Sequence, residues 1–215
     1  MFKRRTRRTY AQSFSALFSL RAWARGTGYV LHRLRRLPDP PHRIARGVGV
    51  GVFVCFTPLF GFHFVLAATL AFLLRGNILA ALLATFFGNP LTFPVIAVVS
   101  IELGAWMLGI PGGMPLPHIA QAFSSASVEL WANIVAMFTA DVARWDRLAE
   151  FYRTVFLPYL LGGLFPGVVT GAIAYAVSLP AISAYQKARI RRLKKRYEKR
   201  RALEAQKADV AGNPH

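Results

Sequence analysis

A hydrophobic block covering residues 44–106 is interrupted twice by proline, first at Pro58 with Gly61 and again at Pro90 with Pro94. Proline lacks an amide donor and clashes with the preceding helical turn, so each break frees backbone groups. Hydrocarbon offers those groups no partner, and they must be satisfied by protein or water. The pattern therefore predicts an all-α integral membrane protein in which Pro-broken hydrophobic segments line a cavity or form a re-entrant hairpin.

The charge of the chain is segregated to its two ends. The net charge is +18 although the mean hydropathy is +0.38. Of the 27 Lys and Arg residues, 12 lie in residues 1–46 and 11 lie in residues 187–207. Basic residues that flank membrane segments mark the cytoplasmic side. Both termini are therefore expected in the cytoplasm, with an even number of full crossings.

The basic ends are expected to contact the membrane surface. Residues 1–43 are predicted to hold an interfacial amphipathic helix, whose apolar side comprises Tyr10, Phe14, Leu17, Phe18 and Trp23. Residues 186–215 form a basic cytoplasmic tail, helical to about residue 208. Anionic headgroups attract each nearby basic residue by roughly 1 kcal/mol. Membrane lipids thus explain the charge, and no nucleic-acid partner is expected.

The membrane domain is expected to cover residues 44–185. Its first segment, residues 44–74, divides at the first break into halves of roughly 20 Å, too short to span hydrocarbon. The halves form either one kinked helix or a re-entrant hairpin. Arg75 follows directly and prefers the cytoplasmic side, which favours the hairpin.

The second segment, residues 78–109, is predicted to be a broken crossing. Residues 111–155 carry a net charge of −1, which predicts an outer loop with a helix packed at the interface. Residues 156–184 form the return crossing. Two full crossings result, although four would satisfy the charge rule equally if both broken segments were hairpins of tilted spans.

Five polar residues are candidates for a substrate or ion site in this domain. Thr57, Asn89 and Thr92 lie beside the prolines, where they either satisfy freed carbonyls or line a polar site. His63 is the only histidine in the apolar block, and a structural role is equally consistent with it. Glu102 needs a partner such as Arg75 or His63, unless it lies near the outer surface.

The sequence gives little support to catalysis. It contains no Ser, His and Asp in the context of a catalytic triad, no catalytic pair of carboxylates on one helical face and no glycine-rich phosphate-binding loop. The remaining histidines are scattered and Cys55 is the single cysteine, so no metal site and no cofactor are expected. We therefore expect a protein that is not an enzyme.

Several short motifs follow one another along the chain: Ala45-Arg46-Gly47, Gly51-Val52-Phe53, Thr57-Pro58 with Gly61, Arg75-Gly76-Asn77 and the string from Gly88 to Pro94. Together they resemble a known bacterial membrane family, the one catalogued as domain of unknown function 2062. The resemblance covers roughly residues 30–185 and implies a small protein of the bacterial inner membrane, without implying an activity. The Pro/Gly pattern is also loosely similar to the DedA family, although this chain has no acidic residue beside its first break.

These observations lead to two functional hypotheses. The first is a transporter-like or lipid-handling protein whose site lies between the two broken segments, and a homo-oligomer could enclose its pathway. The second is a non-catalytic membrane scaffold whose basic ends bind anionic lipid or recruit an envelope-biogenesis partner.

Overall fold

The computed structural model describes residues 20–34, 36–139 and 144–212, and every regular element in these ranges is helical. The all-α prediction is therefore confirmed. The elements are α2 (Leu20–Leu34), α3 (Pro41–Val54), α4 (His63–Leu73), α5 (Ile78–Ala84), a 3-10 turn η1 (Thr85–Phe87), α6 (Phe93–Leu108), α7 (Leu116–Ala136), α8 (Asp146–Phe151), a π-helical turn η2 (Tyr152–Phe156) and α9 (Leu157–Gly212).

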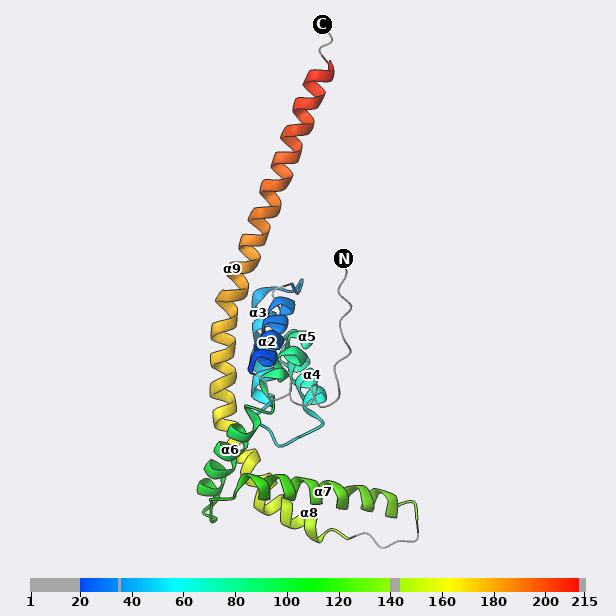
Figure 1. The fold of residues 1–215 in the computed structure, drawn as a ribbon, viewed down its shortest axis with the longest axis vertical. Helices are drawn as coiled ribbons and strands as arrows, with labels where there is room; N and C mark the ends of the chain where they lie inside the picture. The colour runs from blue at the N-terminus through cyan, green and yellow to red at the C-terminus, as the bar shows by residue number, and fades with distance from the viewer. Residues whose placement is uncertain (1–19, 35, 140–143, 213–215) are drawn as a thin grey trace.

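Helix α9 runs along the whole length of the molecule and packs against α6 near its start and α3 further along (Figure 1). Glycines allow the helix backbones to approach closely. A Cβ added at Gly104 would lie 1.8 Å from the carbonyl oxygen of Pro158, and one added at Gly49 would lie 2.8 Å from that of Gly171. Close approach through small residues is typical of helix packing in membranes. Within the described residues, α9 belongs to the one helical stretch long and apolar enough to cross a membrane.

The first hydrophobic segment folds back on itself as two antiparallel halves, α3 and α4. The side chain of Arg46 near the start of α3 donates to the carbonyl of Leu74 at the end of α4, at 3.0 Å. The amide of Asn77 likewise donates to the carbonyl of Arg43 at 2.8 Å. The start and end of the segment therefore lie together, at what we call the basic end of the bundle. Helix α3 begins at Pro41, ahead of the hydrophobic segment, because proline is favoured in the first helical turn.

The second hydrophobic segment does not fold back. Added Cβ atoms at Gly47 and Gly51 would meet the carbonyls of Asn77 and Ala81, so α5 runs parallel to α3. Added Cβ atoms at Gly104 and Gly162 would meet Pro158 and Ser100, so α6 runs antiparallel to α9. Because α3 is also antiparallel to α9, helices α5 and α6 point the same way. The chain thus continues through the second break toward the far end of the bundle.

A polar cluster ties three helices together at the basic end. Asp39 accepts a hydrogen bond from the Asn77 side chain and pairs with Arg43 at 3.1 Å. The carbonyl of Asp39 accepts from Gln186 of α9 at 3.0 Å. Arg75 ends α4 with φ of 52°, a left-handed position normally taken by glycine. The amide of Gly76 reaches the carbonyl of Ala71 there and closes the helix end.

Helices α7 and α8 form a hairpin that lies across the long axis of the molecule, at the end opposite the basic end (Figure 1). The side-chain amide of Asn133 donates to the carbonyl of Arg144, and its Oδ1 accepts from the amide of Arg144. These bonds join the two helices near the hairpin tip. Helix α7 covers residues 116–136 of the predicted loop. It packs alongside α8 instead of continuing the bundle.

Helix α2 lies along the bundle rather than across it (Figure 1). Leu34 joins a buried cluster with Ile44, Ala80 and Ile182. This burial places the end of α2 against α3, α5 and α9. The apolar side predicted from Tyr10 to Phe18 lies outside the described residues.

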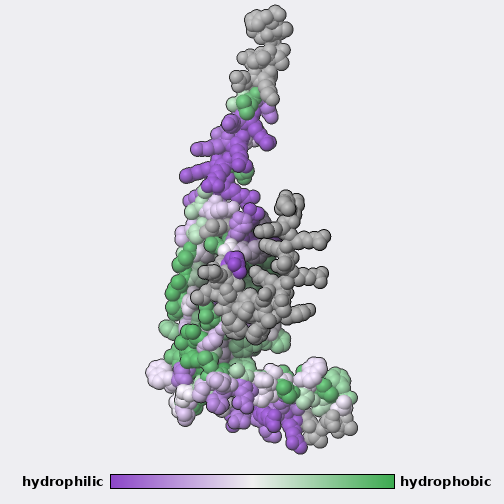
Figure 2. All heavy atoms as spheres, viewed as in Figure 1, coloured by the Kyte–Doolittle hydropathy of each residue, from purple (hydrophilic) through white to green (hydrophobic). Residues whose placement is uncertain are grey.

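The lateral surface of the bundle is strongly apolar, whereas the part of α9 beyond the bundle is hydrophilic (Figure 2). Phe72, Val95 and Phe165 lie on three different helices and are 71%, 64% and 70% exposed. Exposed apolar patches of this kind mark contact with lipid or protein.

Candidate functional site

The two breaks meet at mid-height of the bundle, in a region we call the junction (residues 55–62 and 85–93). The rings of Phe60 and Phe93 lie 5.3 Å apart, and those of Phe56 and Phe87 lie 6.5 Å apart. The Cys55 thiol donates to the carbonyl of Thr85 at 3.3 Å. A cavity of about 260 Å³ lies between the two breaks and is lined in part by Gly61, His63 and Gly88. The two breaks thus lie against each other and share one cavity.

At the first break, polar side chains bond to backbone carbonyls at the C-terminal end of α3. The hydroxyl of Thr57 is buried and donates to the carbonyl of Val54 at 2.8 Å. The carbonyl of Thr57 in turn accepts from Nε2 of His63 at 3.1 Å. A carbonyl cannot donate, so this contact places a proton on Nε2. His63 also packs its ring beside Phe60 and Phe93 and faces the junction cavity.

At the second break, Asn89 and Thr92 build a self-contained turn. Oδ1 of Asn89 accepts from the amides of Leu91 and Thr92, at 2.9 and 3.1 Å. The hydroxyl of Thr92 donates to the carbonyl of Phe87 at 2.6 Å and accepts from the amide of Asn89 at 3.0 Å. These bonds satisfy backbone groups left free between η1 and α6, as one of the two sequence interpretations expected.

Asn89 and Thr92 also border a second, larger hollow. This groove, of about 610 Å³, runs between α2, α3 and α5 and is lined mainly by apolar side chains that include Val48, Val52 and Leu83. Tyr29 of α2 lines it as well and accepts a hydrogen bond from Arg33 at 2.8 Å. The structure therefore divides the candidates: His63 lines the junction cavity, with Thr57 bonded to it, whereas Asn89 and Thr92 line the apolar groove.

Glu102 lies away from both hollows, beside the loop that follows α6. Its carboxylate accepts from the amide of Gly113 at 2.6 Å. Arg75 is at the opposite end of the bundle and His63 is at mid-height, so neither is the partner of Glu102. Of the alternatives drawn from the sequence, the position near the outer loop is the one the geometry matches.

Two buried hydroxyls at the helix contacts escaped the sequence analysis. Tyr159 and Ser100 are 0% exposed, and neither hydroxyl has a hydrogen-bond partner among the described residues. The ring of Tyr159 lies 6.1 Å from that of Phe60 in the first break. The sequence pattern that could have identified Tyr159 is its four-residue spacing with Gly163, Gly167 and Gly171, which places all four on the face of α9 that packs against the bundle. Buried polar groups without partners are uncommon and point to a ligand or ordered water.

No group of three or more potential metal-ligating side chains occurs in the part of the chain that the structure describes. Cys55 is buried and bonded to the carbonyls of Gly51 and Thr85. The hollows instead combine apolar walls with a few hydrogen-bonding groups, which is the character of sites for small molecules and lipids.

One comparison with known proteins gives a match. Residues 24–191 match the model of a family described as an uncharacterized protein conserved in bacteria, DUF2062. No curated protein and no solved structure shows a significant match.

Proposed function

The chain belongs to the bacterial family DUF2062, and from that premise we propose that it is an inner-membrane protein that handles lipid where its two Pro-broken segments meet. The proposed role is non-catalytic. The observation that carries it is the apolar groove of about 610 Å³ between α2, α3 and α5, which reaches the junction at Asn89 and Thr92 of the second break.

The dimensions of α9 support the membrane placement. Residues 157–184 are apolar and measure about 42 Å at 1.5 Å per residue, which matches a bilayer with its headgroup regions. The basic residues of α9 begin at Lys187, just beyond this stretch. In this placement α9 and the broken segment α5–α6 are the two crossings. The α3–α4 hairpin re-enters from the basic end, and both termini are cytoplasmic.

The groove suits one acyl chain. Its walls are apolar over most of their length, and its volume falls within the range of ligand pockets. Arg33 is exposed beside Tyr29 at the rim and supplies a positive charge for an anionic headgroup. The junction next to the groove offers polar groups at mid-depth, where a headgroup that crosses the bilayer needs hydrogen bonds.

A lipid-translocation assay tests this proposal. The full-length protein is reconstituted in liposomes that carry a fluorescent phospholipid, and dithionite bleaches the label in the outer leaflet. Wild-type protein is expected to expose the inner-leaflet label. Val48→Phe places a larger side chain in the groove and should slow translocation of the labelled lipid by about tenfold. That factor corresponds to an over-packing cost of slightly more than about 1 kcal/mol for the lipid in the groove.

The matched control is Val177→Phe, which enlarges an exposed side chain on the outer face of α9. It should leave the rate unchanged. A wild-type rate equal to that of empty liposomes contradicts the proposal, as does an equal loss in both variants.

The scaffold hypothesis draws on a different observation, the extension of α9 beyond the bundle (Figure 1). Residues 187–201 are all exposed and carry ten basic residues against one Glu198. Deletion of residues 187–215 should leave lipid translocation intact if the groove is the site. If deletion of residues 187–215 abolishes lipid translocation, the scaffold hypothesis is favoured instead.

A further inference from the structure

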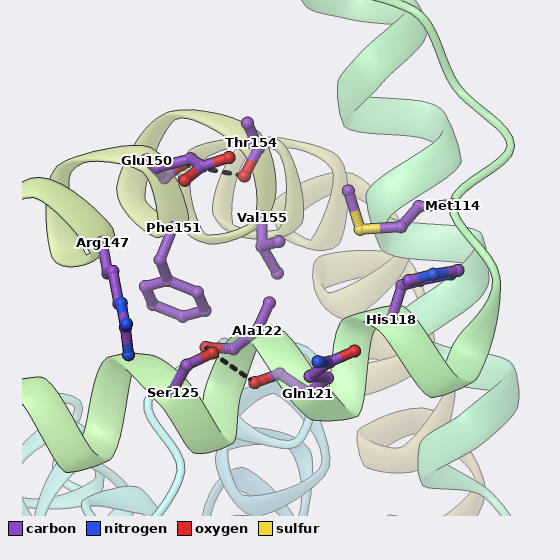
Figure 3. Close-up of a pocket in the computed structure, with 10 residues that line it drawn as sticks. All are labelled: Met114, His118, Gln121, Ala122, Ser125, Arg147, Glu150, Phe151, Thr154 and Val155. Atoms are coloured by element: carbon purple, nitrogen blue, oxygen red, sulfur yellow. Dashed lines mark hydrogen bonds between the residues drawn. The ribbon is translucent and has the colours of Figure 1, made fainter.

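The hairpin at the far end of the bundle contains a polar hollow of about 510 Å³ between α7 and the α8–η2 segment (Figure 3). Arg147, Phe151 and Val155 extend from the α8–η2 side toward Ala122 and Ser125 on α7, while His118 and Met114 lie at the other end (Figure 3). Glu150 lies at the upper rim. The hollow thus combines an apolar floor with charged and hydrogen-bonding groups around it.

Specific contacts hold the two sides of this hollow in place. Near the hairpin tip, Asn133 bonds to both backbone groups of Arg144, and Glu129 accepts from the amide of Arg147 at 3.3 Å. Nearer the bundle, the rings of Phe123 and Phe151 meet edge to face with centroids 4.8 Å apart. The spacing between α7 and α8 is therefore fixed at both ends, which keeps the hollow open.

Within the described residues, no ion pair involves the charges that border the hollow. Among the described residues, ion pairs join Asp39 to Arg43 and Lys194 to Glu198. Neither Arg147 nor Glu150 takes part in one, although they are three residues apart on one helix. A guanidinium and a carboxylate at one hollow are complementary to a ligand that carries both an anionic and a cationic group.

The position of the hollow narrows the ligand further. The hairpin lies across the molecular axis (Figure 1), and its second side, η2, leads directly into α9 at Leu157, where the apolar stretch of α9 begins. In the membrane placement proposed above, on which this inference rests, the start of that stretch lies in the headgroup region of the outer leaflet.

We propose that this hollow binds the headgroup of a phospholipid that carries a phosphate and a protonated amine, with phosphatidylethanolamine as the type. Arg147 contacts the phosphate, because a guanidinium fits two phosphate oxygens at once. Glu150 contacts the ammonium group. The floor around Phe151 and Ala122 takes the glycerol and the first methylenes, which a free phosphate lacks.

Thermal unfolding of the full-length protein in detergent micelles tests the proposal, because a ligand that binds only the folded state raises the midpoint. The probes are short-chain phosphatidylethanolamine, phosphatidylcholine and phosphatidylglycerol, together with glycerophosphoethanolamine and inorganic phosphate. Phosphatidylethanolamine should stabilise wild type most. Arg147→Gln should weaken its binding about tenfold or more, since a charge-assisted contact is lost. Glu150→Gln should remove the preference for ethanolamine over choline and glycerol headgroups.

Arg153→Gln is the matched control, because Arg153 is exposed on the following helical turn and does not line the hollow. It should bind as wild type does. The proposal is overturned if Arg147→Gln binds as tightly as wild type, or if inorganic phosphate stabilises as much as the lipid.

Flotation with phosphatidylethanolamine vesicles separates this inference from the proposed function. Wild type that fails to float with vesicles contradicts the membrane placement itself. Wild type that floats and translocates lipid, while Arg147→Gln leaves headgroup binding unchanged, overturns only the headgroup site.

Discussion

At the scale of single residues, backbone contact through glycine determines how α9 meets the bundle. A Cβ added at Gly162 would lie 2.0 Å from the carbonyl of Ser100, and one at Gly163 would lie 2.1 Å from that of Phe56. No side chain can adjust to relieve such a contact, because the opposing atoms are backbone. The packing therefore requires glycine at these positions.

Gly162→Ala should lower the stability of the protein by about 3 kcal/mol, the upper range for over-packing, because α6 and α9 must separate to admit the methyl group. Gly28→Ala is the control, since nothing lies within 4 Å of a Cβ there. It should be neutral or stabilising by up to about 1 kcal/mol, because alanine is the better helix former. Thermal unfolding in detergent measures both. Equal stability of the two variants would contradict the close α6–α9 contact.

The sequence predicted some of these residue roles and missed others. Asn89 and Thr92 could be expected to satisfy freed backbone groups, because proline identifies where such groups arise. Tyr159 could not be assigned in the same way. Its position at the junction depends on how α9 packs against a segment about 100 residues earlier in the chain, which local pattern does not determine.

At the scale of elements, two similar sequence breaks give different geometries. The first reverses the chain over residues 55–62, with Gly61 at φ of 87°. At the second, Gly88 stays extended and the Asn89–Thr92 turn leads directly into α6 in the original direction. The positions of the prolines predicted both breaks, and the charge of Arg75 favoured the hairpin at the first. The direction after the second break depends on side-chain bonds within the turn.

Asn89→Ala should destabilise the protein by about 1–2 kcal/mol, because the amides of Leu91 and Thr92 lose their acceptor. Asn89→Asp retains an acceptor oxygen and should keep most of the stability. Unfolding in detergent measures the difference. If alanine and aspartate were equally tolerated, the turn would not depend on this side chain.

At the scale of the whole molecule, α9 serves two regions with different surroundings. Its first part packs against α6 and α3 as far as Ile182, which is 2% exposed. Its later part projects beyond the bundle, and Figure 2 shows it as hydrophilic. The apolar and basic runs of the sequence predicted this division. The apolar and basic runs belong to one uninterrupted helix that continues through Pro166 and Pro180. The sequence did not predict this continuity, because proline usually interrupts a helix.

Truncation on either side of Ile182 tests this division. A chain that ends at Gln186 should unfold at the wild-type temperature, because the bundle contacts of α9 are kept. A chain that ends at Pro180 loses the buried Ile182 and should be less stable by about 2–4 kcal/mol. Equal unfolding midpoints for both truncations would mean that this turn of α9 does not stabilise the bundle.

The central claim is that the two breaks meet inside a bilayer around the junction cavity, which we expect water to reach from one side of the membrane. Single-cysteine labelling in intact cells and inverted vesicles, with a membrane-impermeant thiol reagent on a Cys55→Ser background, tests it most directly. His63→Cys faces the cavity, Val65→Cys faces outward from α4, and Leu116→Cys lies in the hairpin. We predict labelling of His63→Cys from one side of the membrane, labelling of Leu116→Cys in intact cells, and none at Val65→Cys. Labelling of Val65→Cys as strong as that of Leu116→Cys, or silence of His63→Cys from both sides, would contradict the account.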